Sequence, residues 1–182
     1  GLLITKALVK KMPEYDFMYL GDTKRVPYGD RSQETIYEFT KDAIDYLLKH
    51  DCKLIIIACN TASTHALRKL QQEYLPKYFP DRKILGIIIP TAEIVADRKD
   101  IQKIGILATQ ATVNSKVFIK EIKKLNPGVK IFQQSAPLLT PLIEKNGLKW
   151  IDPILRDYLK PLIKKKVGAI LLGCTHYPII KN

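Results

Sequence analysis

The segment Leu54-Ile55-Ile56-Ile57-Ala58-Cys59-Asn60-Thr61-Ala62-Ser63 decides the fold of this chain. Its apolar run ends abruptly at a cysteine, which small amide and hydroxyl residues follow. A short apolar run bounded in this way is typical of a buried strand in a parallel sheet. After Cys59 the apolar spacing becomes helical, and Asn60, Thr61 and Ser63 are candidate helix caps. We therefore place Cys59 between the carboxyl end of a strand and the amino end of a helix.

The same pattern returns later in the chain. The segment Ala169-Ile170-Leu171-Leu172-Gly173-Cys174-Thr175-His176-Tyr177-Pro178 is again an apolar run that ends at a cysteine. By analogy, Cys174 also lies where a strand ends and a helix begins. Open α/β sheets bind ligands at this edge. The two cysteines therefore predict one site that is approached from two sides.

The rest of the chain alternates between short apolar runs and helical periodicity. We predict strands near residues 16–20, 54–58, 84–89, 104–108, 129–132 and 169–173, and helices near 2–12, 32–48, 61–78, 92–99, 113–122, 138–146 and 150–166. Strict alternation of this kind indicates an α/β fold with doubly wound parallel sheets. Both halves run from a strand through helices to a cysteine strand. We therefore expect two similar domains, residues 1–95 and 96–182.

Composition narrows the class of protein. The 182 residues are 46% hydrophobic and 26% charged, which is typical of a globular chain, and no apolar run has the length of a membrane span. Three cysteines without C-x-x-C or zinc-ligand spacing indicate reduced thiols in the cytoplasm and predict no metal site. The chain begins at Gly1 without a methionine, and Leu2 and Leu3 already fit the middle of a helical face, so we expect a fragment.

The net charge of +12 has two interpretations. It can attract nucleic acid or another polyanion. It can equally reflect a solvated, lysine-rich surface, because the lysine runs lie at the predicted helix ends and do not alternate with stacking aromatic residues. We favour the solvated surface and do not expect a nucleic-acid partner.

Two cysteines at helix amino ends suit a particular proton transfer. The thiolate is the reactive form of cysteine, and a helix amino end lowers the thiol pKa and can also hold a carboxylate. One sulfur could take a proton from a carbon atom while the other returns a proton to the opposite face, which is a two-base racemisation. His176, beside Cys174, could assist this transfer.

Each candidate also has a purely structural interpretation. A core cysteine at a strand end is the default, and only the repeated context favours chemistry at Cys59 and Cys174. Cys52 keeps the structural interpretation. Tyr28 could simply brace a turn, and Glu144 could be a solvated residue on a helix face. We interpret His50 and His65 as surface or hydrogen-bonded residues, and His176 could likewise cap a helix.

These segments resemble the glutamate racemases, the cofactor-independent racemases of bacterial cell-wall synthesis. The matching motifs span almost the whole chain in the family's order: Tyr19-Leu20-Gly21-Asp22-Thr23, Arg25-Val26-Pro27-Tyr28-Gly29, Ala58-Cys59-Asn60-Thr61-Ala62-Ser63, Gly105-Ile106-Leu107-Ala108-Thr109 through Thr112-Val113 to Ser115, and Gly173-Cys174-Thr175-His176-Tyr177-Pro178. The resemblance implies a cytoplasmic isomerase that acts on glutamate as a small-molecule substrate, with no metal, no pyridoxal phosphate and no membrane partner. It leaves open whether the protein is a homodimer.

The resemblance also assigns roles to individual residues. It implies that Cys59 and Cys174 are the acid/base pair, assisted by His176, in a cleft between two pseudo-twofold-related domains. The residues that it implies in substrate binding or support are Tyr28, Gly29, Asn60, Thr61, Thr112, Glu144, Thr175 and His176.

This sequence departs from the family pattern at both ends. The family opens with a strand and an Asp-Ser-Gly turn that precede the position of Gly1, and it continues past Asn182. An aspartate racemase-like enzyme of the same superfamily and a catalytically silent binding relative are the alternatives to a glutamate racemase.

Overall fold

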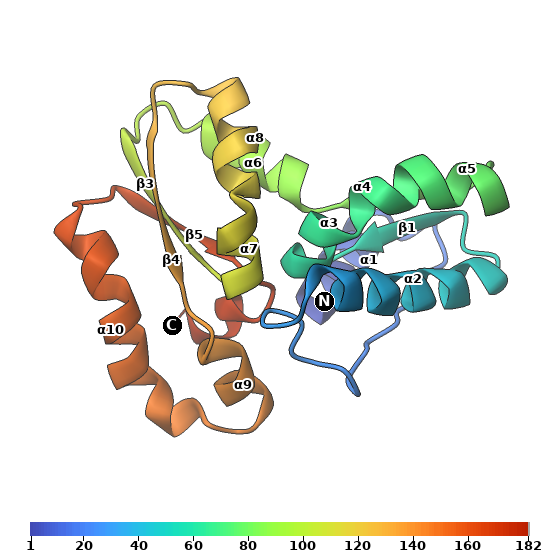
Figure 1. The fold of residues 1–182 in the computed structure, drawn as a ribbon, viewed down its shortest axis with the longest axis horizontal. Helices are drawn as coiled ribbons and strands as arrows, with labels where there is room; N and C mark the ends of the chain where they lie inside the picture. The colour runs from blue at the N-terminus through green and yellow to red at the C-terminus, as the bar shows by residue number, and fades with distance from the viewer. Residues whose placement is uncertain (182) are drawn as a thin grey trace. The chain divides into compact units, whose positions relative to one another are not determined.

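The computed structural model describes residues 1–181 (Figure 1). The chain divides into two compact units, Gly1–Ile87 and Ile88–Asn182, which are called unit 1 and unit 2 below. The division falls at the start of helix α6 (Ile88–Ala96), whereas the expected domain boundary at residues 95 and 96 falls at its end. Both units contain parallel strands connected by helices, which confirms the predicted α/β class.

Unit 1 contains a two-stranded parallel sheet. Strand β1 (Leu54–Ile57) pairs with β2 (Lys83–Gly86). The helices of this unit are α1 (Leu2–Lys11), α2 (Gln33–Lys49), α3 (Asn60–His65), α4 (Leu67–Lys69), the π-helical segment η1 (Leu70–Tyr74) and α5 (Leu75–Tyr78). The Ser32 side chain accepts a hydrogen bond from the Thr35 N–H, which confirms the predicted start of α2.

The core of unit 1 lies on one face of its sheet. Ile55, Ile57 and Ile84 point into this core, where they meet apolar residues from α2 and from the helical run that follows β1. Leu54 and Leu85 alternate with them, point to the opposite face and are half exposed.

Two predictions for unit 1 need correction. Residues 16–20 belong to neither sheet, and Phe17 to Leu20 are exposed, because an apolar run becomes a strand only where a neighbouring strand takes up its hydrogen bonds. The helix expected over 61–78 is instead a chain of shorter segments. Pro76 lies in α5 and has no N–H to donate within an α-helix. The π-helical segment η1 comes immediately before α5.

Unit 2 contains a three-stranded parallel sheet in the order β4-β3-β5. The strands are β3 (Lys103–Ala108), β4 (Lys130–Ser135) and β5 (Ala169–Gly173). The helices are α6, α7 (Gln110–Ser115), α8 (Val117–Leu125), α9 (Leu139–Glu144) and α10 (Ile151–Lys164), with the 3₁₀ segments η2 (Leu148–Trp150) and η3 (Tyr177–Ile180).

Helices cover both faces of this sheet (Figure 1). Along β3, Ile104, Ile106 and Ala108 pack with residues of α6 and α8. Leu107, one position out of phase, packs with α9 and α10. Because successive side chains of a strand alternate between faces, a central strand that is buried on both sides is apolar throughout, and unit 2 is doubly wound as predicted.

The connection between β2 and β3 differs from the prediction. The apolar run over 84–89 was expected to form a strand that Pro90 ends. Instead, β2 ends at Gly86 and α6 begins at Ile88, so that Pro90 lies in the first turn of the helix. Proline is tolerated there because the N–H groups of a first helical turn have no partner within the helix.

Gly173 allows the close approach of β5 to β3. It pairs with Ala108, and a Cβ atom at position 173 would lie 2.9 Å from the Ala108 Cβ and 3.3 Å from the Leu107 carbonyl oxygen. We expect Gly173→Ala to lower the free energy of unfolding by about 1–3 kcal/mol, because both neighbours belong to the packed sheet. Urea denaturation measures this change.

Gly128→Ala is the matched control for this substitution. A Cβ atom at position 128 would meet only the Asn126 Oδ1, at 3.9 Å. An equal loss of stability in both variants would contradict the packing argument.

Candidate functional site

Cys59 caps the helix that follows β1. Its backbone is extended, and its Sγ accepts a hydrogen bond from the Ala62 N–H at 3.5 Å. The Ser63 hydroxyl donates to the Ile57 carbonyl at 2.8 Å and ties the first turn of α3 to the end of β1. The predicted strand-end position of Cys59 is therefore found, but the cap is the thiol itself and not Asn60, Thr61 or Ser63.

The environment of Cys59 acts on the thiol in two opposite directions. Cys59 is half-buried, and the loss of hydration raises the pKa of its thiol, since it disfavours the charged thiolate. Hydrogen bonds from Ala62 and Thr61 lower it, as expected at a helix amino end. Burial is the larger effect, so the pKa of the Cys59 thiol lies above its ordinary value. The sequence predicted only the lowering contribution.

The loop before α2 is held by a network around Asp22. The Tyr28 hydroxyl donates to the Asp22 carboxylate, which also pairs with the Arg25 Nε at 2.6 Å. Arg25 reaches Asp42 on α2 at 2.9 Å and lies over the Phe39 ring. Tyr28 therefore braces a turn, as its structural interpretation predicted.

This network also bears on the chemistry available to Tyr28. Burial and the Asp22 carboxylate raise the pKa of Tyr28 well above its usual range, so that the hydroxyl stays protonated and acts as a donor. Cys59 contributes to the electrostatic environment of Tyr28. Gly29, the next residue, is buried.

In unit 2, polar side chains from α9 and from the end of β5 surround the second cysteine. The buried Cys174 Sγ lies 3.6 Å from the Thr140 Oγ1 and 3.7 Å from the His176 Nδ1. The His176 Nε2 pairs with the Glu144 carboxylate. Thr140 and Glu144 come from α9, whereas the cysteine and the histidine come from the end of β5.

The Glu144 carboxylate determines which His176 nitrogen carries the proton. An ionised carboxylate only accepts hydrogen bonds, so the Nε2 must donate. In the neutral ring the Nδ1 then presents a lone pair to the Cys174 thiol. His176 is thus oriented to take a proton from this sulfur or to return one to it.

The remaining predicted residues lie at the ends of β1, β3 and β5. Ala108 pairs with Gly173, so Thr109 and Cys174 leave neighbouring strands at one edge of the sheet. Thr109 donates to the Thr112 hydroxyl at 3.0 Å, and both are buried. Thr175 is half-buried beside Cys174. In unit 1, Asn60 and Thr61 are buried in the first turn of α3.

Sequence reasoning missed Thr140 and the capping role of the Cys59 thiol. The detectable signal for Thr140 was its spacing, since it precedes Glu144 by four residues on one helix, and residues so spaced share a face. The segment after Cys174 was expected to be an α-helix, and the structure places the short 3₁₀ segment η3 there.

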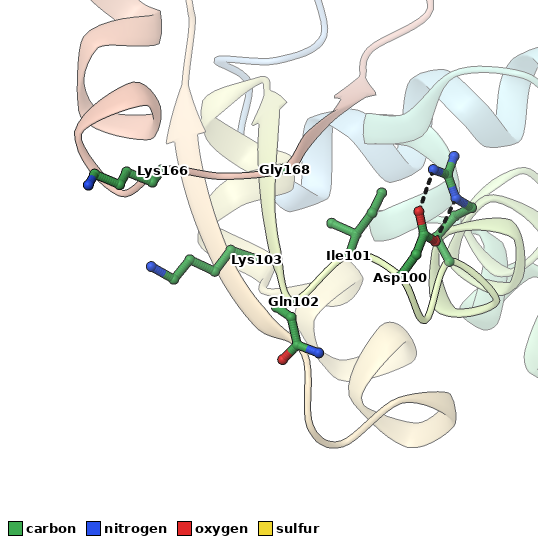
Figure 2. Close-up of a pocket in the computed structure, with 7 residues that line it drawn as sticks. Asp100, Ile101, Gln102, Lys103, Lys166 and Gly168 are labelled. Carbon is green, nitrogen blue, oxygen red and sulfur yellow. Dashed lines mark hydrogen bonds and ion pairs between the residues drawn. The ribbon is translucent and has the colours of Figure 1, made fainter.

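A hollow of about 500 Å³ lies elsewhere on unit 2 (Figure 2). It is lined by Arg98, Asp100, Ile101, Gln102, Lys103, Lys166 and Gly168. Lys103 begins β3 and Gly168 immediately precedes β5, so the hollow is at the amino ends of the strands. Cys174 follows the carboxyl end of β5, so the hollow is separate from the cysteine site.

Residues 1–181 contain neither a membrane-spanning helix nor a group of metal-binding side chains. No helix in that range is both long and apolar enough to cross a membrane. Within the same range, no three His, Cys, Asp or Glu side chains are grouped as the ligands of a metal ion would be.

Comparison with known proteins identifies the family of the chain and several similar members of it. The family described as Asp/Glu/Hydantoin racemase matches residues 3–182, and the chain belongs to this family. The glutamate racemase of Sulfurihydrogenibium sp. is 38% identical over 100% of the chain and 69% of its own length. A Neisseria meningitidis glutamate racemase is also 38% identical, with 66% of its length covered. The chain therefore spans about two thirds of the length of these relatives.

Solved structures give the same result. A glutamate racemase isoform from Bacillus anthracis matches with a TM-score of 0.89 at 28% identity, over 100% of this chain and 66% of that one. The Francisella tularensis glutamate racemase, solved in complex with D-glutamate, matches with a TM-score of 0.87 at 33% identity and the same coverage.

The raised pKa of Cys59 can be tested by alkylation. In a chain that carries Cys52→Ser and Cys174→Ser, we expect the rate of reaction with a small neutral alkylating reagent to rise with pH around a midpoint above about 8.5. The same variant unfolded in urea is the control, because its thiol is fully solvated. A midpoint in the folded chain at or below that of the unfolded chain would contradict the dominance of burial.

Proposed function

We propose that this protein interconverts L-glutamate and D-glutamate by proton transfer between the substrate α-carbon and two cysteines. Family membership and the names of the curated relatives support a glutamate racemase. The structural match to a racemase solved with D-glutamate supports glutamate as the substrate.

The single observation that carries this proposal is the equivalent placement of two thiols. Cys59 follows β1 and Cys174 follows β5, each at the carboxyl end of a parallel strand, where α/β folds bind ligands. Racemisation without a cofactor needs one group that removes the α-proton and another that delivers a proton to the opposite face. Two thiols that act on opposite faces of one substrate carbon meet this need.

Unit 2 supplies one cysteine of the proposed pair, Cys174, together with side chains that contact its sulfur. In the thiolate form, Cys174 removes the α-proton of L-glutamate and becomes a thiol. The His176 Nδ1, held toward it by the Glu144 pairing, exchanges a proton with the sulfur between turnovers. Cys174 and His176 are thus the catalytic residues of this half, and Glu144 orients the histidine.

Unit 1 supplies the opposite face. The raised pKa of Cys59 favours the protonated thiol, which returns a proton to the α-carbon when Cys174 has removed one. In the reverse direction, Cys59 removes the α-proton of D-glutamate and Cys174 returns one.

The side chains around each thiol are suited to an amino acid. We assign substrate contacts to Tyr28, Gly29, Asn60, Thr61, Thr112, Thr175 and His176. The threonine hydroxyls, the Asn60 amide and the backbone N–H groups in this set can donate hydrogen bonds that hold a carboxylate, whereas the Tyr28 hydroxyl donates to Asp22. In the cell, this activity would supply D-glutamate for peptidoglycan in the cytoplasm, with no pyridoxal phosphate and no metal.

Serine substitutions test the role of each thiol. We expect Cys59→Ser and Cys174→Ser to lose racemisation in both directions, by about a hundredfold or more, because each turnover needs both groups and a serine hydroxyl is too weak an acid to replace a thiol. The measurement is polarimetry of glutamate with the full-length protein, with aspartate as a comparison substrate. A variant that keeps full racemisation would exclude the two-thiol mechanism.

Elimination separates the roles of the two cysteines. Loss of a β-leaving group from a substituted glutamate needs only the thiol that removes the α-proton. We expect Cys59→Ser to process the L-form of such an analogue through Cys174, and Cys174→Ser to process the D-form through Cys59. Reversed enantiomer preferences would show that the two roles are assigned the wrong way round.

A further inference from the structure

Thr140 contacts the reactive sulfur of unit 2 in a way that the roles above do not use. Its Oγ1 lies 3.6 Å from the Cys174 Sγ, and both residues are buried. In the buried interior this pair is shielded from water, and a hydrogen bond there is electrostatically stronger than one at the surface.

Thr140 is the second residue of α9, and its hydroxyl contacts the sulfur. In the middle of a helix, a threonine hydroxyl commonly bonds to the carbonyl four residues earlier, as Thr40 does in α2, where its Oγ1 donates to the Ile36 carbonyl at 2.6 Å. For Thr140 that carbonyl belongs to Ala136, which accepts the Tyr177 hydroxyl at 2.9 Å. The Thr140 hydroxyl is directed instead at the sulfur.

The direction of donation depends on the state of the sulfur. A thiolate has no proton and only accepts, so the hydroxyl must donate to it. The neutral His176 ring presents an Nδ1 lone pair to the sulfur and cannot donate from that atom, because its proton is on the Nε2 that faces Glu144. When the histidine is neutral, the Thr140 hydroxyl can therefore still donate a hydrogen bond to the Cys174 thiolate, whereas the His176 Nδ1 cannot.

We propose that Thr140 is a positioning residue whose hydroxyl donates a hydrogen bond to the Cys174 thiolate and so holds this sulfur ready to accept a proton. The value of this contact for turnover rests on the proposed racemase function, but the hydrogen bond itself is a property of unit 2 alone. It stabilises the thiolate more than the thiol, because hydrogen bonds to a charged group are about twice as strong as those between neutral groups.

Thiol titration tests the contact without any substrate. In the full chain with Cys52→Ser and Cys59→Ser, isotope-labelled Cys174 can be followed by the NMR shift of its Cβ as the pH is raised. We expect Thr140→Val, which keeps the shape and removes the hydroxyl, to raise the Cys174 midpoint by about one pKa unit, which is about a tenfold loss of thiolate below the midpoint. Thr140→Ser restores the hydroxyl and should restore the midpoint.

Thr40→Val is the matched control, because it also removes a buried helical hydroxyl, but one that bonds to its own helix. We expect it to leave the Cys174 midpoint unchanged. An unchanged midpoint in Thr140→Val, or equal shifts in Thr140→Ser and Thr140→Val, would overturn the proposal. If Thr140→Val does not fold, the serine variant and Thr140→Ala decide the question in the same way.

Racemase kinetics distinguish this inference from the proposed function. Because the enantiomers have equal free energies, kcat/KM must fall equally in both directions in Thr140→Val, and its pH profile should move upward with the Cys174 midpoint. A shifted midpoint without any racemisation in the parent protein would contradict the proposed function alone. Racemisation with an unshifted midpoint would contradict the role of Thr140 alone.

Discussion

The parallel pairing of β3 with both of its neighbours is the constraint on which the chemistry of unit 2 depends. Ala108, the last residue of β3, pairs with Gly173 on one side and with Ser135 on the other. The Ala136 N–H extends the second ladder by donating to the Ala108 carbonyl at 2.9 Å. Since all three strands run in one direction, the segments that follow them leave the sheet at a single edge. Residues from three distant parts of the sequence meet there without any long loop.

The two cysteines occupy equivalent strand ends in different electrostatic environments. Cys59 receives backbone N–H groups from its own helix, and its burial outweighs them. Cys174 is contacted by side chains, a threonine hydroxyl and an imidazole, each from a defined position. The two-base reaction proposed above needs one sulfur protonated while the other is ionised. In general, enzymes use dissimilar surroundings to give chemically identical groups the separate roles of acid and base.

The sequence predicted secondary structure correctly where a strand is buried on both faces or where a motif is repeated, because such segments have only one interpretation. The runs before Cys59 and Cys174 are strands, and alternation along the chain gives the parallel α/β class. It failed where the outcome depends on distant neighbours. Residues 16–20 have strand-like composition but pair with no strand, and Pro90 is compatible both with a strand end and with a first helical turn. The net pKa direction of Cys59 depends on how deeply the thiol is buried, which no local pattern records.

The exposure of Cys174, His176 and Glu144 increases in that order from the core to the solvent. This order limits the free-energy cost of burying polar groups. The Cys174 residue is 7% exposed, whereas the side chains of His176 and Glu144 are 23% and 38% exposed. The Glu144 carboxyl group thus keeps contact with solvent, which lowers the cost of placing an ionisable group beside the core. Beside the sulfur lie the hydroxyl of Thr140 and the imidazole of His176. The sequence-based interpretation of Glu144 as a solvated residue was therefore correct about its exposure and incomplete about its role. A half-exposed carboxylate still pairs with the Nε2 of the histidine and so keeps its Nδ1 directed at a buried thiol.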